Sequence, residues 1–284
     1  MNNNVVAQFE QWMSYFVENY AQNEQLKESM LYSLEAGGKR IRPRLLFAAY
    51  DYYGLIYNED MFKVAASIEM VHTYSLIHDD LPAMDDDDYR RGKLTNHKVY
   101  GEATAILAGD ALLTDAFYLL TKTHFSTSTI VELIRVLSQA AGSSGMVAGQ
   151  MLDMESENRE VTYDTLKRIH RKKTGCLLTA PLMMAAIIAK QNPEKMEKLG
   201  EHLGLAFQIR DDILDVIGTK DELGKNPHQD EKANKSTYPK QLTLKGAKQV
   251  LNEELDSALN YCQTKNATSL KSLIKQLYIK EGKA

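Results

Sequence analysis

Apolar residues recur at intervals of three or four along most of this 284-residue chain. That spacing puts apolar side chains on one face of an α-helix, and strand-like alternation bounded by turn residues is scarce. Proline is also rare: six residues are about 2% of the chain, against a usual share of roughly 5%. We therefore expect an all-α fold, with apolar helical segments at 5–20, 62–78, 103–122, 129–153, 163–190, 194–217 and 241–262.

The charge balance excludes some partners. The chain has 34 basic and 38 acidic residues, a net charge of −4, and no long basic tract, so we expect no nucleic-acid partner. Hydrophobic residues make up 44% of the chain, enough for the core of one domain over residues 1–284. The start lacks the pattern of a secretory signal, and no stretch approaches 18 uncharged apolar residues. These features predict a cytoplasmic protein without a membrane span.

Three breaks interrupt the helical pattern, at 37–43, 81–93 and 218–239. The last is a polar run without hydrophobic period, which is long for a passive connection and predicts a mobile active-site lid. Cys176 and Cys262 form no CxxC pair and have no histidine cluster nearby, so we expect incidental thiols, with neither a zinc site nor a disulfide.

The second break contains six aspartates within residues 79–88. Adjacent carboxylates repel one another unless water or cations neutralise them, so a solvated acidic turn and a cation site are the two readings. At 100° per residue, His72, Ser75 and Asp79 share one stripe of the preceding helix. An EF-hand calcium loop is excluded, because its required glycine would fall at Arg91. The remaining faces carry residues typical of a buried helix: Met70, Val71, Tyr74 and Ile77.

A second acidic patch lies about 130 residues later. Gln208, Asp211, Asp212 and Asp215 project to one stripe of a helix that is otherwise apolar. Carboxylates at this spacing destabilise a solvated helix face, and a divalent cation would remove the penalty. Oxygen ligands without histidine or cysteine favour magnesium, and two such patches suit a bound diphosphate. Arg210 projects into the apolar arc, where snorkelling is its only evident explanation.

Basic residues that could balance a diphosphate occur at the chain breaks. Each group alone would be ordinary surface charge, but their association with the breaks beside the acidic patches favours anion binding. Nucleotide P-loop, dinucleotide, zinc-protease and serine-hydrolase motifs are absent from the sequence. The basic groups are Lys39, Arg40, Arg42 and Arg44; Arg90 and Arg91; Lys172 and Lys173; and Lys225 and Lys235.

The chain resembles the short-chain trans-prenyl diphosphate synthases, most closely the bacterial farnesyl diphosphate synthase group. The resemblance implies an all-α fold of ten or more helices around a central cavity, a homodimer, and three Mg²⁺ ions. It spans about 200 residues, in the family's order. The matching segments are GGKRIRP (37–43), HTYSLIHDDLPAMDDDDYRRG (72–92), GQMLDM (149–154), KTG (173–175), FQIRDDILD (207–215) and KSTYP (235–239).

The resemblance also implies roles for individual residues. Asp79 and Asp85 would hold two ions, with Asp80 assisting, and Asp211 would hold the third, supported by Asp212 and Asp215. The pocket for isopentenyl diphosphate would be formed by Lys39, Arg42, His72 and Arg91. Catalytic roles on the allylic diphosphate and the reacting carbons fall to Arg90, Lys173, Thr174, Gln208 and Lys225, and Lys235 would belong to the closing segment. No role follows for Asp86, Asp87 and Asp88.

The implied reaction is ionisation of an allylic diphosphate such as dimethylallyl or geranyl diphosphate, attack by the double bond of isopentenyl diphosphate, and loss of a proton. The resemblance favours Tyr74 as the floor that limits the product to farnesyl diphosphate, although Ser75 lies more nearly beneath Asp79 on an ideal helix. The alternatives are a geranylgeranyl diphosphate synthase, a terpene cyclase, which the second basic pocket disfavours, and a non-catalytic regulatory subunit.

Overall fold

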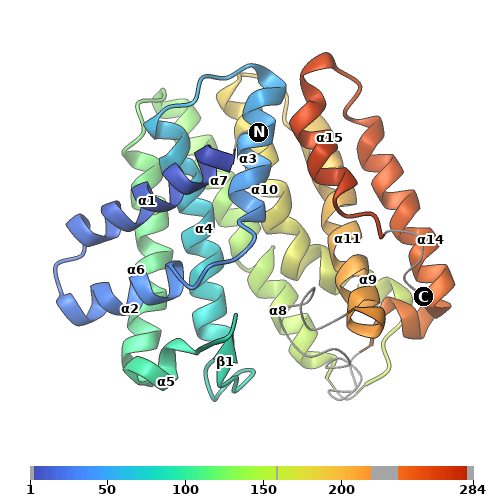
Figure 1. The fold of residues 1–284 in the computed structure, drawn as a ribbon, viewed down its shortest axis with the longest axis horizontal. Helices are drawn as coiled ribbons and strands as arrows, with labels where there is room; N and C mark the ends of the chain where they lie inside the picture. Colours follow the sequence, from blue (N-terminus) through green and yellow to red (C-terminus); the bar gives the residue numbers. More distant parts are fainter. Residues whose placement is uncertain (1–2, 158, 219–235, 280–284) are drawn as a thin grey trace. The chain divides into compact units, whose positions relative to one another are not determined.

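The computed structural model describes residues 3–157, 159–218 and 236–279. Ten or more α-helices account for most of these residues, which confirms the all-α expectation (Figure 1). Within the described part of the chain, the β structure is one antiparallel hairpin of two short strands, β1 (Tyr89–Arg90) and β2 (Lys93–Leu94).

The chain divides into two compact units. The first unit comprises Met1–Phe47 and Ile56–Ile134, and the second comprises Ala48–Leu55 and Arg135–Ala284. Two helices, α3 and α7, run through residues of both units along the sequence.

The first unit is organised around α4, which packs along α6. Most residues of α4 are buried, on several sides of the helix. Asn58 caps the start of the helix by accepting a hydrogen bond from the Met61 N–H at 3.1 Å. Glu59 and Asp60 follow in the first turn, where negative charge favours the helix dipole. Its complete helices are α1 (Asn3–Tyr20), α2 (Glu24–Leu34), α4 (Glu59–Asp79), α5 (Asn96–Tyr100) and α6 (Glu102–Thr121). The helices α3 (Ile41–Tyr53) and α7 (Thr127–Ala141) begin in this unit and end in the second.

The second unit is organised around α11, which packs against α10 and α14. Tyr238 at the start of α14 is fully buried, with its ring 5.7 Å from that of Tyr163 and 5.5 Å from that of His170. The elements are α8 (Met146–Glu155), α9 (Tyr163–His170), the π-helix η1 (Arg171–Gly175), α10 (Cys176–Ile188), α11 (Glu194–Ile217), α14 (Tyr238–Asn260), the 3₁₀ turn η2 (Lys265–Ala267) and α15 (Thr268–Lys275).

The predicted break at 81–93 coincides with the turn and hairpin after α4. Of the predicted break at 37–43, residues 37–40 form the loop before α3, whereas residues 41–43 already belong to the first turn of that helix. Most of the predicted lid, with Lys225 and Lys235, lies outside the described residues. Cys176 and Cys262 are free thiols, as expected.

Among the described residues, α6 is one helix whose length and hydropathy would suffice to cross a membrane. Three acidic residues, Glu102, Asp110 and Asp115, lie within it, and one side of it packs against α4. Only 39% of its most apolar window is buried, so much of its outward surface is exposed.

Candidate functional site: a basic cluster, an aspartate turn and a carboxylate-lined pocket

The stripe predicted on α4 is present. His72, Ser75 and Asp79 are partly exposed along one side of the helix. Most of the other residues in this segment are buried because they face the core of the first unit. The buried side chains are Met70, Val71, Tyr74 and Ile77, as expected.

The aspartate cluster forms a turn that folds back on the end of α4. The Asp85 N–H donates to the Asp79 carbonyl at 2.8 Å, and Asp86 has a left-handed backbone with φ 50°. The side chains of residues 85–88 are exposed, and Asp88 forms an ion pair with Lys98 at 2.7 Å. The backbone bond therefore holds Asp85 close to Asp79, while Asp88 is engaged elsewhere.

Asp80 differs from its neighbours because it is buried, at 3% exposure. The Arg90 Nε donates to both of its carboxylate oxygens, at 2.7 and 2.9 Å. Burial raises the pKa of Asp80, while Arg90 opposes that rise. The resemblance implies that Asp80 assists at the metal and that Arg90 grips a diphosphate; in the structure the two side chains bind each other.

The hairpin sets Arg91 against the glycine loop. Arg91 and Gly92 occupy its two-residue turn with φ 54° and 77°, the conformation that suits the twist of such hairpins. The Arg91 guanidinium donates to the Gly37 carbonyl. Gly38 beside it has φ 128°, a backbone conformation that residues with a side chain rarely adopt, so the loop needs glycine there.

The basic residues of the first unit gather around His72. Burial lowers the pKa of His72 well below its usual value, and the positive charges of Arg42 and Arg91 lower it further. Burial also lowers the pKa of Arg42 to about 10, against the influence of Glu69. Arg42, His72 and Arg91 therefore form one electropositive group, and Lys39 lies exposed in the adjoining loop.

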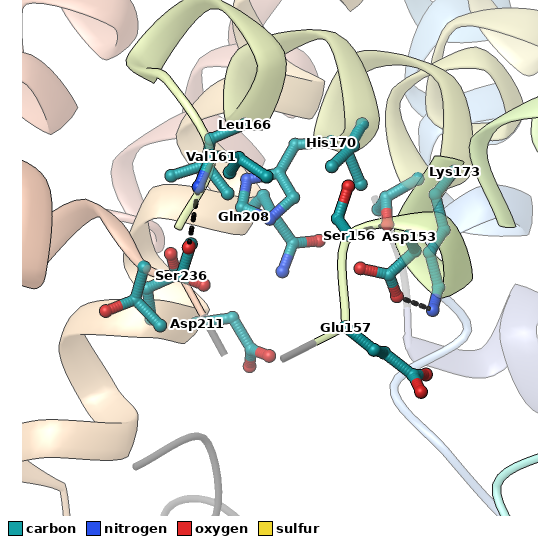
Figure 2. Close-up of a pocket in the computed structure, with 14 residues that line it drawn as sticks. Asp153, Ser156, Glu157, Val161, Leu166, His170, Lys173, Gln208, Asp211 and Ser236 are labelled. Atoms are coloured by element: carbon teal, nitrogen blue, oxygen red, sulfur yellow. Dashed lines mark hydrogen bonds and ion pairs between the residues drawn. The ribbon is translucent and has the colours of Figure 1, made fainter. Parts of the chain in front are cut away.

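The second unit contains a pocket of about 170 Å³ (Figure 2). Acidic, basic and amide side chains from α8, η1 and α11 line it, together with residues near the start of α14. The lining residues are Asp153, Ser156, Glu157, Val161, Leu166, Ile169, His170, Lys173, Thr174, Gln208, Asp211, Asp212, Ser236 and Thr237.

Two side-chain pairs organise this pocket. Lys173 Nζ lies 2.5 Å from Asp153 Oδ2, and the Thr174 hydroxyl donates to Gln208 Oε1 at 2.9 Å. Figure 2 shows the Asp153–Lys173 pair on one side, Asp211 on the other, and Gln208 between them. Three predicted residues, Lys173, Thr174 and Gln208, therefore meet at one pocket.

Lys173 and Thr174 belong to a π-helical turn, a local widening that is frequent at functional sites. Close packing accompanies it: a Cβ at Gly149 of α8 would lie only 2.1 Å from the Lys173 backbone nitrogen. A Cβ at Gly204 of α11 would lie 2.6 Å from the Gly175 Cα. The glycines let the backbones of α8 and α11 approach η1 closely.

The three carboxylates of α11 occupy different environments. Asp211 is partly exposed and lines the pocket. Asp212 is buried and accepts a hydrogen bond from the Tyr238 N–H at 3.0 Å, which ties α11 to the start of α14. Asp215 is also buried. Burial lowers the pKa of the neighbouring Arg210, with Asp211 opposing, and its buried Nε has no hydrogen-bond partner in the described part of the chain.

Across the described residues, no three His, Cys, Asp or Glu side chains lie close enough together to hold a metal ion. Magnesium commonly takes one or two protein carboxylates, with waters and substrate phosphate as its other ligands. Asp79, Asp85 and Asp211 offer hard oxygen donors of this kind, and their partial or full exposure leaves them accessible.

Sequence reasoning gave no role to Asp153, although it lies within the quoted segment GQMLDM. An acidic residue three positions after the motif glutamine was the available signal. It also left Glu69 unassigned, because a single acid within an apolar helix has no distinctive spacing.

Comparisons with known proteins agree with this geometry. The farnesyl diphosphate synthase of Bacillus subtilis is 49% identical over 256 residues, covering 88% of this chain and 86% of the relative. Two solved structures share the fold. An FPP/GFPP synthase from Zymomonas mobilis has a TM-score of 0.85 at 33% identity, covering 95% of this chain and 96% of that one. A geranyltransferase of Helicobacter pylori, complexed with magnesium and isoprenyl diphosphate, has a TM-score of 0.81 at 32% identity, covering 98% of both chains.

The family profile described as polyprenyl synthetase matches residues 23–277, which include most of both compact units, the aspartate turn and the pocket of the second unit. This chain belongs to the polyprenyl synthetase family.

Proposed function

We propose that this chain condenses isopentenyl diphosphate with dimethylallyl or geranyl diphosphate in the presence of Mg²⁺, giving farnesyl diphosphate and pyrophosphate. One observation carries the proposal: α4 bears His72 within a partly exposed basic cluster and Asp79 beside an exposed carboxylate turn. A basic cluster suits a diphosphate bound directly, and a carboxylate turn suits one bound through cations.

We assign the ions to Asp79 and Asp85 of the first unit and to Asp211 of the second, with three ions in total. When bound, Mg²⁺ supplies Lewis-acid stabilisation of the leaving diphosphate. Arg90 and Lys173 add positive charge to the allylic diphosphate. Each is paired with a carboxylate, Asp80 or Asp153, so substrate binding would exchange one anionic partner for another.

Thr174 and Gln208 suit the carbocation that ionisation leaves behind. Their hydroxyl and amide oxygens are weakly basic dipoles, which stabilise positive charge without forming a bond to it as free water would. The departing pyrophosphate can accept the proton lost at the end, so the reaction requires no strong protein base. Lys225 and Lys235, outside the described residues, complete the proposed set.

We further propose that residues 1–284 act as one prenyl synthase domain, with 218–239 as its lid, in a cytoplasmic homodimer without a membrane span. The outward face of α6 supports the dimer. Ile106 and Leu107 there are 42% and 59% exposed, and Val99 of the adjoining α5 is 44% exposed. Apolar residues gathered in this way are typical of a protein interface.

The decisive experiment measures pyrophosphate release by the purified protein with Mg²⁺, isopentenyl diphosphate and geranyl diphosphate. Asp79→Ala is expected to lower kcat by on the order of a hundredfold or more, because a ligand to the activating ions is lost. Asp88→Ala is the matched control from the same cluster, since Asp88 is paired with Lys98, and its kcat should stay near that of the parent.

Circular dichroism checks that both variants keep their helices. Near-normal activity of Asp79→Ala at saturating Mg²⁺ would contradict the metal assignment. Failure of the parent protein to release pyrophosphate would instead favour the non-catalytic regulatory subunit.

A further inference from the structure

Arg40 is a basic residue that points into the protein. It lies between the glycine loop and α3, is 5% exposed, and has a left-handed backbone with φ 47°. A non-glycine residue keeps that conformation only where its surroundings hold it there. The contacts of its side chain therefore decide how α3 begins.

Three acceptors engage the Arg40 guanidinium. Nη1 donates to Glu69 Oε1 at 2.9 Å, Nε donates to Glu10 Oε1 at 2.8 Å, and Nη2 donates to the Leu34 carbonyl at 2.5 Å. The Arg40 carbonyl also accepts from the Arg44 N–H at 3.0 Å, the first backbone bond of α3. Arg40 thus fixes the position of the first turn of α3, which contains Arg42.

Glu69 lies on α4, one turn before His72 and nearly three turns before Asp79. Its side chain is 3% exposed, so the Arg40–Glu69 pair is buried at both ends. Its Oε2 is buried and accepts no hydrogen bond from any residue in the described ranges. Its negative charge opposes the loss of a proton from both Arg42 and Arg91.

We infer that Arg40 and Glu69 are positioning residues: their buried ion pair holds the first turn of α3 against α4, so that Lys39, Arg42 and His72 present a preorganised site to one diphosphate. This rests on the proposed function and extends it to residues that do not touch the substrate. Preorganisation raises affinity because the ligand does not have to order the loop when it binds.

Replacing Glu69 separates positioning from simple electrostatics. Glu69→Gln keeps the shape of the side chain but removes a negative charge beside the basic cluster, so attraction alone would strengthen diphosphate binding and lower KM. If the Arg40–Glu69 pair positions the basic cluster, Glu69→Gln has the opposite effect: KM for isopentenyl diphosphate rises about tenfold, while KM for the allylic diphosphate stays unchanged.

The matched control is Glu10→Gln, which removes a partner of the same guanidinium on α1, where the carboxylate is 40% exposed. It should leave KM for isopentenyl diphosphate within about twofold of the parent, because exposed pairs contribute little. Arg40→Lys keeps the positive charge, but a lysine ammonium cannot reproduce the several directed hydrogen bonds of the guanidinium. It should therefore raise KM for isopentenyl diphosphate, as Glu69→Gln does. If Glu69→Gln does not fold, Arg40→Lys carries the test alone.

Calorimetric titration with isopentenyl diphosphate, without the second substrate, gives a readout independent of turnover. A Kd raised about tenfold in Glu69→Gln and in Arg40→Lys supports the positioning role. An unchanged or lowered Kd and KM in a folded variant, with the parent fully active, overturns this inference alone. An inactive parent overturns the proposed function instead.

Discussion

The Tyr74 ring lies on the buried side of α4, one turn before His78, with the two ring centroids 5.6 Å apart. Burial and the nearby Asp79 carboxylate both raise the pKa of its phenol. An aromatic side chain so close to the aspartates can stop a growing prenyl chain. Ser75 is partly exposed and its hydroxyl donates to the His72 carbonyl, so its small side chain offers less obstruction.

Tyr74→Ala is therefore expected to lengthen the product beyond farnesyl diphosphate, because it removes the ring that limits the chain. Chromatography and mass analysis of the dephosphorylated products measure this, with Ser75→Ala as the control that keeps the parent product. An unchanged range of product lengths in an active Tyr74→Ala enzyme would show that Tyr74 does not limit the product. A parent product of twenty carbons would instead identify a geranylgeranyl diphosphate synthase.

His72 should make stability depend on pH. Burial, and then the surrounding arginines, lowers its pKa in the folded protein below the usual 6.5. Below that pH the unfolded state binds more protons than the folded state, so the free energy of unfolding falls as pH falls.

We expect urea denaturation at about pH 7 and about pH 5 to show a loss of up to about 1.4 kcal/mol per pH unit from this group. His72→Gln lacks the titrating ring and should lose less stability over the same interval. If the free energy of unfolding changes equally with pH in the two proteins, His72 does not cause the pH dependence of stability.

At the scale of elements, the contact between α8 and η1 depends on Gly149. A Cβ there would meet backbone atoms of Lys172 and Lys173 at 2.1 to 2.6 Å, and backbone cannot rotate away as a side chain can. Any added atom must therefore push η1, with Lys173 and Thr174, away from α8.

Gly149→Ala is expected to lower the free energy of unfolding by about 1–3 kcal/mol through overpacking, and to lower kcat as Lys173 shifts. Gly246→Ala is the same substitution on α14, where the nearest contact is the Leu242 Cβ at 3.2 Å, and it should leave kcat unchanged. Thermal unfolding and steady-state assays measure both. A Gly149→Ala protein as active and stable as Gly246→Ala would contradict the close packing.

At the scale of the whole molecule, the exposed apolar face of α6 predicts association of two chains. Analytical ultracentrifugation should show a dimer for the parent, and Leu107→Asp should shift it toward monomer because a charge would be buried at the interface. Ile56→Asp is the control: Ile56 is 82% exposed and lies outside α6. Unchanged sedimentation of Leu107→Asp would place the interface elsewhere.

The all-α class, the breaks before α3 and after α4, and the polar stripe of α4 could be predicted from the sequence. Helical periodicity is a local property, so spacing alone identifies which residues share a face. The stripe of His72, Ser75 and Asp79 follows from the 100° step of a helix, and so does the burial of Tyr74. The family motifs likewise contain Lys173, Thr174 and Gln208, which line one pocket in the structure.

Only the tertiary structure decided which charges bind one another. Asp80 and Asp79 are adjacent acids in sequence, yet Asp80 is buried against Arg90 while Asp79 stays partly exposed. Arg40 and Arg42 are the same residue type two positions apart, yet Arg40 turns inward to Glu69, 29 residues away. The strength of a charge pair depends on separation and burial, which are set when distant segments pack together. Local spacing determines which face a residue occupies, and packing determines which partner it meets there.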